Sequence, residues 1–260
     1  MKNSLILFIP VLVIFGAALA EDFTSQETIT VTVSPNDRLE IYNINGDITL
    51  EEWDSSELEL TYVKKAEDAE TLEHIIVEIV EDRGLECNVE YDDDWDDFEN
   101  TSVDFIVYIP SDRDLDIETA FVNGDIRLVG GSGVAEIELV NGDMDISGFS
   151  GALEAYLVNG DMNLTGVPAL ETAELVNGTI TCELSSVEND LDLSSVSGDI
   201  IVKLQNGAYV VIETISGEIE IADSFGATVS ENYIGRSSEF GSGEYELEIN
   251  TVSGNIQVTD

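Results

Sequence analysis

One short phrase decides the fold: Val140-Asn141-Gly142-Asp143-Met144, which returns along the chain with small variations. Its other copies are centred on Gly46, Gly124, Gly160, Gly178, Gly198, Gly217 and Gly254. From Gly124 to Gly178 the copies lie 18 residues apart each time, and the next two intervals are 20 and 19 residues. A phrase that returns at a nearly fixed interval indicates a structural repeat. We therefore interpret these glycines as structural turns of a repeating unit.

Apolar residues occupy fixed places on both sides of each turn. Around Gly142 they are Ala135, Ile137, Leu139, Val140, Met144 and Ile146. Apolar residues that alternate with polar ones predict β-strands with one buried face, and we expect these columns to supply that face. The Asn-Gly or Ser-Gly pair between the strands predicts a turn, because glycine accepts positive φ at little steric cost.

Two all-β topologies fit this pattern. The first is a β-solenoid, parallel and β-helix-like, with about 18–20 residues per coil, in which each coil buries its apolar face against its neighbours. The alternative is an antiparallel β-meander with Asn-Gly hairpins, in which Leu139 would face Met144. Equal intervals favour the solenoid, because a meander tolerates strands of drifting length.

Stacked coils would align equivalent side chains about 4.8 Å apart. The asparagines of the phrase would then form an amide ladder through Asn123, Asn141, Asn159 and Asn177. Asp125, Asp143 and Asp161 would align as well. Two such carboxylates repel each other by about 0.9 kcal/mol in water, a repulsion that salt or a bound cation relieves. These aspartates are the candidate metal ligands, with calcium as the candidate ion; no other cofactor is predicted.

The composition is strongly acidic. The chain holds 9 Lys and Arg against 55 Asp and Glu, a formal net charge of −46. This charge argues against nucleic acid as a partner, because phosphate binding relies on clustered Lys and Arg. Hydrophobic residues make up 43% of the chain, which argues against a disordered acidic tail. The composition indicates a folded, halophilic protein, since salt screens a highly charged surface.

The first 20 residues predict a signal peptide. Lys2 precedes an apolar run from Leu5 to Leu19, and Ala18-Leu19-Ala20 is a small-residue cleavage signature. The run is short for a membrane span, which needs about 20 apolar residues. We expect cleavage and export to the extracellular space or cell surface. The alternative is an uncleaved anchor, which would be the chain's contact with a membrane.

The rest of the chain divides into two expected parts. Residues 21–110 form a β-rich part with one early coil around Gly46, separated from the later coils, and a short helix over 66–73. Asp92 to Asp97 are expected to form a charged, solvated loop. Residues 111–260 form the regular solenoid. Because the last coil runs almost to the end of the chain, we expect an uncapped edge there.

The two cysteines fall in strand patterns. Cys182 occupies a core column of the repeat, and Cys87 lies on the apolar side of a strand. Both are predicted to be small buried hydrophobic residues rather than a disulfide pair.

A family resemblance rests on these phrases and their order. The segment from Val107 to Ile126, the repeated Asn-Gly-Asp and Ser-Gly-Asp phrases, and the segment from Gly241 to Ile256 carry it. The early Asn45-Gly46-Asp47-Ile48 phrase with Trp53-Asp54 also matches. The chain resembles the DUF4097 putative-adhesin family of exported β-solenoid proteins. The resemblance implies an extracytoplasmic repeat domain and brings no motif of catalytic residues.

Three functional hypotheses follow. The first is a non-enzymatic, secreted or cell-surface β-solenoid that acts in adhesion or envelope structure, with a protein or glycan partner. The second is a calcium- or cation-dependent surface-binding protein. The third is a polysaccharide-active β-helix enzyme, which would need a pair of carboxyl groups. No such pair stands out among so many acidic residues, and His74 is the only histidine, so a histidine-based triad has little support.

Overall fold

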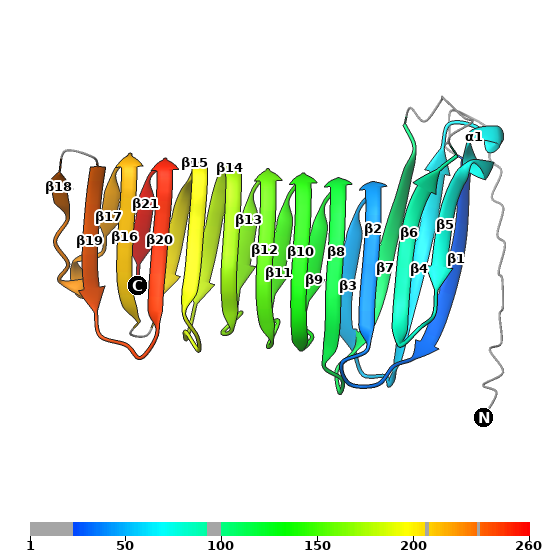
Figure 1. Cartoon of the computed structure of the whole chain (residues 1–260), viewed down its shortest axis with the longest axis horizontal. Helices are drawn as coiled ribbons and strands as arrows, with labels where there is room; N and C mark the ends of the chain where they lie inside the picture. The colour runs from blue at the N-terminus through cyan, green and yellow to red at the C-terminus, as the bar shows by residue number, and fades with distance from the viewer. Residues whose placement is uncertain (1–22, 93–99, 206–207, 233–234) are drawn as a thin grey trace.

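The computed structural model describes residues 23–92, 100–205, 208–232 and 235–260. Figure 1 shows an elongated stack of strands, with a row of long strands in front of a row of shorter ones. Each regular coil places one long strand in the front row and one short strand behind it, with the glycine turn between them. The regular coils are β8 (Leu115–Asn123) with β9 (Ile126–Val129), β10 (Gly133–Asn141) with β11 (Met144–Ser147), and β12 (Ala152–Asn159) with β13 (Met162–Thr165).

Two further coils are single strands that run through the turn. They are β14 (Leu170–Leu184) and β15 (Leu191–Leu204). The remaining coils are β2 (Arg38–Asn45) with β3 (Ile48–Trp53), β16 (Tyr209–Ser216) with β17 (Ile219–Ile221), and β20 (Glu246–Ser253) with β21 (Ile256–Thr259).

Neighbouring coils pair in parallel, one full repeat apart. Leu139 lies opposite Leu157 in the long strands, and Met144 lies opposite Met162 in the short ones. The turn joins the same ladder, because the Gly142 N–H donates to the Asn159 carbonyl at 3.0 Å. The turns at Gly46, Gly124, Gly160 and Gly254 bond in the same way, to the next coil rather than within a hairpin. The predicted β-solenoid is confirmed, and the hairpin meander is wrong.

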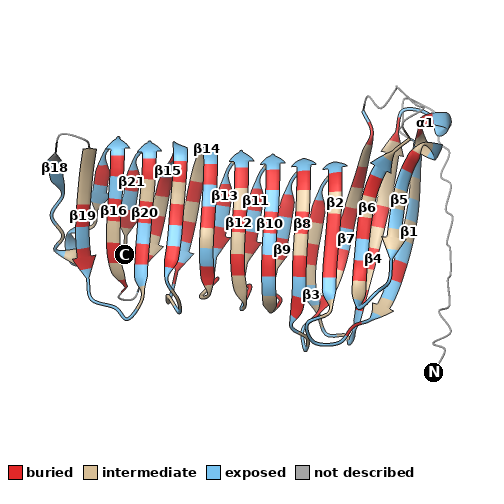
Figure 2. Cartoon of the chain, viewed as in Figure 1, coloured by how far each residue is buried: buried red, intermediate tan, exposed pale blue. Residues whose placement is uncertain are grey.

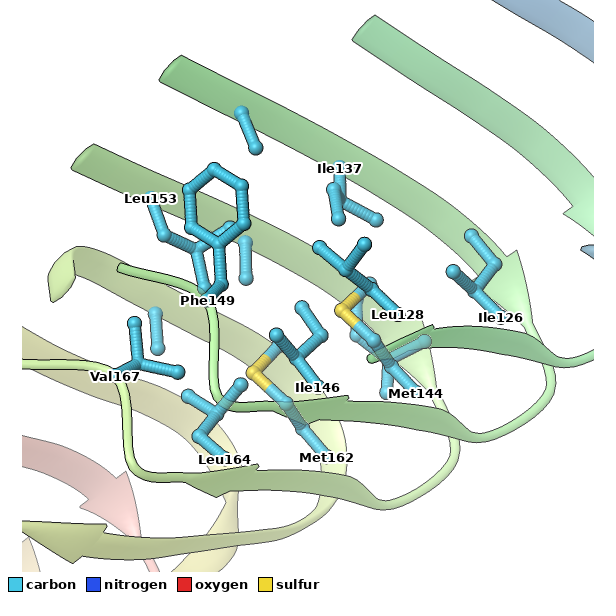
Figure 3. Packing of buried hydrophobic residues seen from close by; sticks show 14 of the residues in the cluster. Ile126, Leu128, Ile137, Met144, Ile146, Phe149, Leu153, Met162, Leu164 and Val167 are labelled. Atoms are coloured by element: carbon cyan, nitrogen blue, oxygen red, sulfur yellow. The ribbon is translucent and has the colours of Figure 1, made fainter. Parts of the chain in front are cut away.

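The core lies between the two rows of strands. In Figure 2 buried and exposed residues alternate along the strands, and Figure 3 shows Met144, Met162, Ile146 and Leu164 stacked in the interior. One predicted column is wrong. Leu139 is buried, whereas Val140 is 38% exposed. Side chains of adjacent strand residues point to opposite faces, so the column just before the asparagine cannot share a face with the three alternate columns that precede it.

The order of the coils in space differs from their order in the chain. The pair β2 and β3 lies directly against β8 and β9. The last pair, β20 and β21, lies between β15 on one side and β16 and β17 on the other. The expected separation of the early coil is therefore wrong, and so is the expected uncapped edge at the last coil. Both coils carry the same apolar columns as the other coils, so each can stack between two neighbours.

Antiparallel strands cover both ends of the stack. At the amino-terminal end, β6 (Gly84–Tyr91) and β7 (Ser102–Pro110) still pair in parallel with β2 and β3. The antiparallel strands outside them are β5 (Ile75–Val80) on β6, β4 (Glu57–Ala66) on β7, and β1 (Phe23–Thr32) on β4. At the other end they are β18 (Ser230–Asn232) and β19 (Gly235–Gly241), which pairs with β16. The short helix η1 (Asp223–Phe225) places Phe225 against Phe240, with ring centroids 5.3 Å apart.

Several smaller predictions have clear outcomes. A helix is present as α1 (Ala69–Glu73), where the Asp68 side chain accepts from the Thr71 N–H. Both cysteines are buried and free, as predicted. The predicted signal peptide and most of the acidic loop after Asp92 lie outside the described residues. Within the described ranges, the fold contains no helix with the length and apolar character of a membrane span.

A candidate binding groove along the coils

One row of exposed apolar side chains crosses eight coils. Each member sits two residues before the turn glycine or its equivalent, and their exposed fractions run from 37% to 63%. In spatial order the row is Ile44, Val122, Val140, Val158, Val176, Val196, Val252 and Ile215. At about 4.8 Å per coil it is roughly 34 Å long. We call these eight side chains the valine row.

Strand propensity alone does not account for the valine row. Threonine suits a strand as well as valine does, and it exposes less apolar surface. The chain nevertheless places valine or isoleucine at this position in all eight coils. Contiguous apolar surface that remains in contact with water marks interaction sites on soluble proteins.

The valine row forms one side of a groove. A hollow of about 610 Å³ extends over β8, β10, β12, β14 and β15. Its outward-facing lining pairs Val122, Val140, Val158, Val176 and Val196 with Ala120, Glu138, Tyr156, Glu174 and Ser194. A second hollow of about 470 Å³ continues from Ser194 and Ser195 to Ile215 and Arg236. The two hollows share these serines, so the groove follows the solenoid axis across most of the coils.

Acidic side chains border the groove. Glu138 and Glu174 are part of its lining. The next column outward brings together Glu118, Glu136 and Glu154, which lie opposite one another in adjacent strands. Burial, and then the charges of Glu138, Glu118 and Glu154, raise the pKa of Glu136. The border of the groove is therefore a strongly negative environment.

Few cations balance these charges. At one end of the border Arg38 contacts Glu40 at 2.5 Å and Glu118 at 3.9 Å. At the far end of the groove Arg236 donates to the Gly217 carbonyl and lies 3.7 Å from Glu231. Between these ends, Tyr156 donates its hydroxyl proton to Glu154 at 2.7 Å. The middle of the groove is thus apolar on one side and acidic on the other.

The predicted amide ladder is confirmed. Each asparagine side chain donates to the side-chain oxygen of the preceding coil, at 2.8 to 2.9 Å from Asn123 through Asn141 and Asn159 to Asn177. Such a ladder fixes the register between coils, because a slip of one residue would break every bond in it.

The turn aspartates are aligned and bound to the backbone. The Asp125 Oδ1 atom accepts from the Asp143 N–H, and the Asp143 Oδ1 atom accepts from the Asp161 N–H, both at 2.9 Å. Across the described part of the chain, no three His, Cys, Asp or Glu side chains gather as a metal site. Through these hydrogen bonds to backbone N–H groups, Asp125, Asp143 and Asp161 hold neighbouring turns together, and calcium binding by them stays a prediction.

We expect calcium to stabilise the protein at low salt if these aspartates bind it. Millimolar calcium should then raise the melting temperature, and Asp143→Asn combined with Asp161→Asn should remove the gain. Asparagine keeps the Oδ1 acceptor while removing the charge, so the fold is retained. The measurement is thermal unfolding with calcium, compared with sodium chloride at equal ionic strength. An equal rise in both salts would assign the effect to screening.

The turn glycines lie where the long strand of each coil turns into the short one. Gly46, Gly124, Gly142, Gly160 and Gly178 have φ between +130° and +141°. Gly198, Gly217 and Gly254 lie outside the positive-φ range, yet each also approaches the carbonyl oxygen of a neighbouring glycine. These glycines shape the turn, and the Gly217 carbonyl accepts from Arg236 at the far end of the groove.

Sequence reasoning missed the valine row as a surface feature. The available signal was the alternation of side chains along the strand, because Ala135, Ile137 and Leu139 share one face and Val140 falls on the other. The bordering acids were visible in the sequence. Their alignment beside an apolar row depends on the parallel register, which the sequence indicates only through its period.

The class of protein is a β-solenoid with a lengthwise apolar groove and an acidic border. Residues 132–259 match the model of the Toastrack DUF4097 family. The resemblance predicted from the repeated phrase is confirmed there. No curated protein sequence matches the chain.

The solved structures that match the chain include proteins from Clostridium sporogenes, Bacteroides fragilis and Parabacteroides distasonis. A "putative cell adhesion protein" from Clostridium sporogenes is 10% identical, with a TM-score of 0.38, over 92% of this chain and 99% of its own. A "putative adhesin" from Bacteroides fragilis is 13% identical, with a TM-score of 0.37, over 90% and 97%. A "putative lipid binding protein" from Parabacteroides distasonis is 15% identical, with a TM-score of 0.31, over 90% and 97%. At such identities and scores the similarity says nothing about function.

Proposed function

We propose that this chain is a non-enzymatic protein held outside the cell, at the surface or in the envelope, and that the groove is its contact surface. The observation that carries the proposal is the valine row, which remains exposed over eight coils. A row of this length would lose its contact with water on meeting a partner, at a gain of about 25 cal/mol for each Å² of apolar surface buried.

The shape of the fold supports a contact role. A solenoid presents an extended, repetitive surface, and such surfaces bind elongated partners. The resemblance of the repeated phrases to the DUF4097 putative-adhesin family agrees with this use, and the predicted export signal would bring the fold to the cell surface. The partner is a protein or glycan of that surface.

We expect immobilised full-length protein to retain purified cell envelopes of the producing organism. Val140→Ser combined with Val158→Ser should reduce retention by about tenfold or more, because every 1.4 kcal/mol of lost contact energy is a factor of ten. The matched control is Val134→Ser on the same strand β10, since Val134 is 54% exposed and lies outside the groove. Equal retention by the double variant and the control would contradict the proposal.

A screen on acidic glycans tests the alternative that the chain is a polysaccharide-active enzyme. A polysaccharide-active enzyme would release reducing ends or unsaturated products from them. Release that persists when Glu138 and Glu174 are both replaced by Gln would place such an activity away from the groove.

A further inference from the structure

We infer that the groove binds an extended, cationic polypeptide segment, whose apolar side chains lie on the valine row and whose Lys or Arg side chains reach the acidic border. This inference rests on the proposed function, because it takes the groove as the contact surface and names its occupant.

The length of the groove suits an extended chain. Its first hollow holds about 610 Å³ across five coils. Five coils span about 19 Å along the solenoid axis. An extended chain of about six residues covers the same 19 Å.

The two sides of the groove match the two faces of an extended chain. Side chains of an extended segment alternate between faces. A segment that alternates apolar and basic residues would place one set on Val140, Val158 and Val176, and would direct the other set toward Glu138 and Glu174. Charge pairs at such a border raise the association rate and exclude partners of the wrong sign.

The charge of the chain opposes the other candidate occupants. A second copy of this chain carries the same net charge of −46, so an interface between two such grooves would bring their acidic columns together. A fatty acid or an anionic lipid would place its negative head group beside Glu138 and Glu174. Glu118, Glu136 and Glu154 lie opposite one another in the next column and add to this negative charge.

Fluorescence anisotropy with defined peptides tests the inference on the full-length protein. The probe is a fluorescein-labelled octapeptide that alternates lysine with valine. Its two comparison peptides replace every lysine by glutamate, or every valine by serine. We expect the lysine–valine peptide to bind at least about tenfold more tightly than either comparison peptide. Equal binding of the lysine–serine peptide would show a purely electrostatic contact and would overturn the inference.

Variants locate the contact. Val140→Ser with Val158→Ser should weaken lysine–valine binding about tenfold, and Val134→Ser should leave it within about twofold. Glu138→Gln with Glu174→Gln should weaken binding and flatten its dependence on salt, because the charge pairs are removed. Binding that is the same in the valine double variant and in the unchanged protein overturns the inference.

Two further outcomes separate this inference from the proposed function. If the valine double variant loses envelope retention but no peptide binds, the proposed function stands and the cationic-peptide inference fails. Vesicles of neutral phosphatidylcholine provide the lipid comparison, and groove-dependent binding to them without peptide binding would replace the polypeptide by a lipid surface. If neither retention nor peptide binding depends on Val140 and Val158, both proposals fail.

Discussion

Gly160→Ala is expected to destabilise the protein by about 3–6 kcal/mol, because two separate effects add at this turn. Gly160 has φ of +141°, a backbone conformation that residues with a Cβ atom rarely adopt. A Cβ atom there would also lie 1.8 Å from the Gly142 carbonyl oxygen of the preceding coil. The two coils could separate only by breaking the ladder between them. The measurement is the free energy of unfolding from denaturant titration.

The matched control is Gly166→Ala in the return loop of the same coil. Gly166 also has positive φ, +66°, but its nearest neighbour would be 3.8 Å from an added Cβ. We expect a loss of roughly 1–2 kcal/mol from backbone strain alone. The difference between the two variants then measures the close approach of the coils together with the greater backbone strain at φ of +141°. Equal losses would mean that the stacking distance at Gly160 relaxes freely and that steric contact contributes nothing.

The turn and the core were readable from the sequence because they recur. Each copy of the phrase carries the same physical constraint, namely glycine at the close approach and apolar residues facing inward. The repetition therefore reveals the strand, the turn and the parallel register together. The same constraint explains why Leu139 and Met144 were placed correctly in the core.

The groove was harder to predict because it depends on which face of the strand each residue occupies. Val140 has an apolar side chain, as core residues do, but it lies on the outward face of its strand. Apolar character alone placed it inside, whereas strand geometry places it outside. A residue whose type and position disagree in this way, repeated in eight coils, is a stronger sign of binding than any single motif in this chain.

The spatial order of the coils could not be predicted for a different physical reason. Stability in a repeat protein is approximately a sum over neighbouring units, and these units are nearly interchangeable. A coil of the right pattern fits between any two others. The sequence therefore indicates which residues face which column, but it does not say that β20 and β21 lie between β15 and β16.

The placement of β20 and β21 between β15 and β16 leads to the second prediction with a large expected effect. A chain ending at residue 244 lacks β20 and β21, which supply the partners of β16 and β17 in the stack. We expect β16, β17 and β19 to lose their protection in amide hydrogen exchange, while β8 to β14 keep theirs, because each coil depends chiefly on its neighbours. Retained protection of β16 would mean that it has moved onto β15 in place of the missing coil.

An internal deletion provides the opposite case. Gly198 and Gly254 lie 56 residues apart, so removing the 38 residues from 206 to 243 leaves a spacing of 18, the regular period of the solenoid. β20 and β21 would then follow β15 directly, in the place on β15 that they already occupy. We expect this shorter chain to keep exchange protection in β15, β20 and β21, although it lacks the antiparallel cap.

The newly exposed edge of this shorter chain should also favour association between chains, which sedimentation measures. If the internal deletion unfolds β15 while the truncation at 244 does not, then the capping strands, rather than the inserted last coil, stabilise this end of the stack.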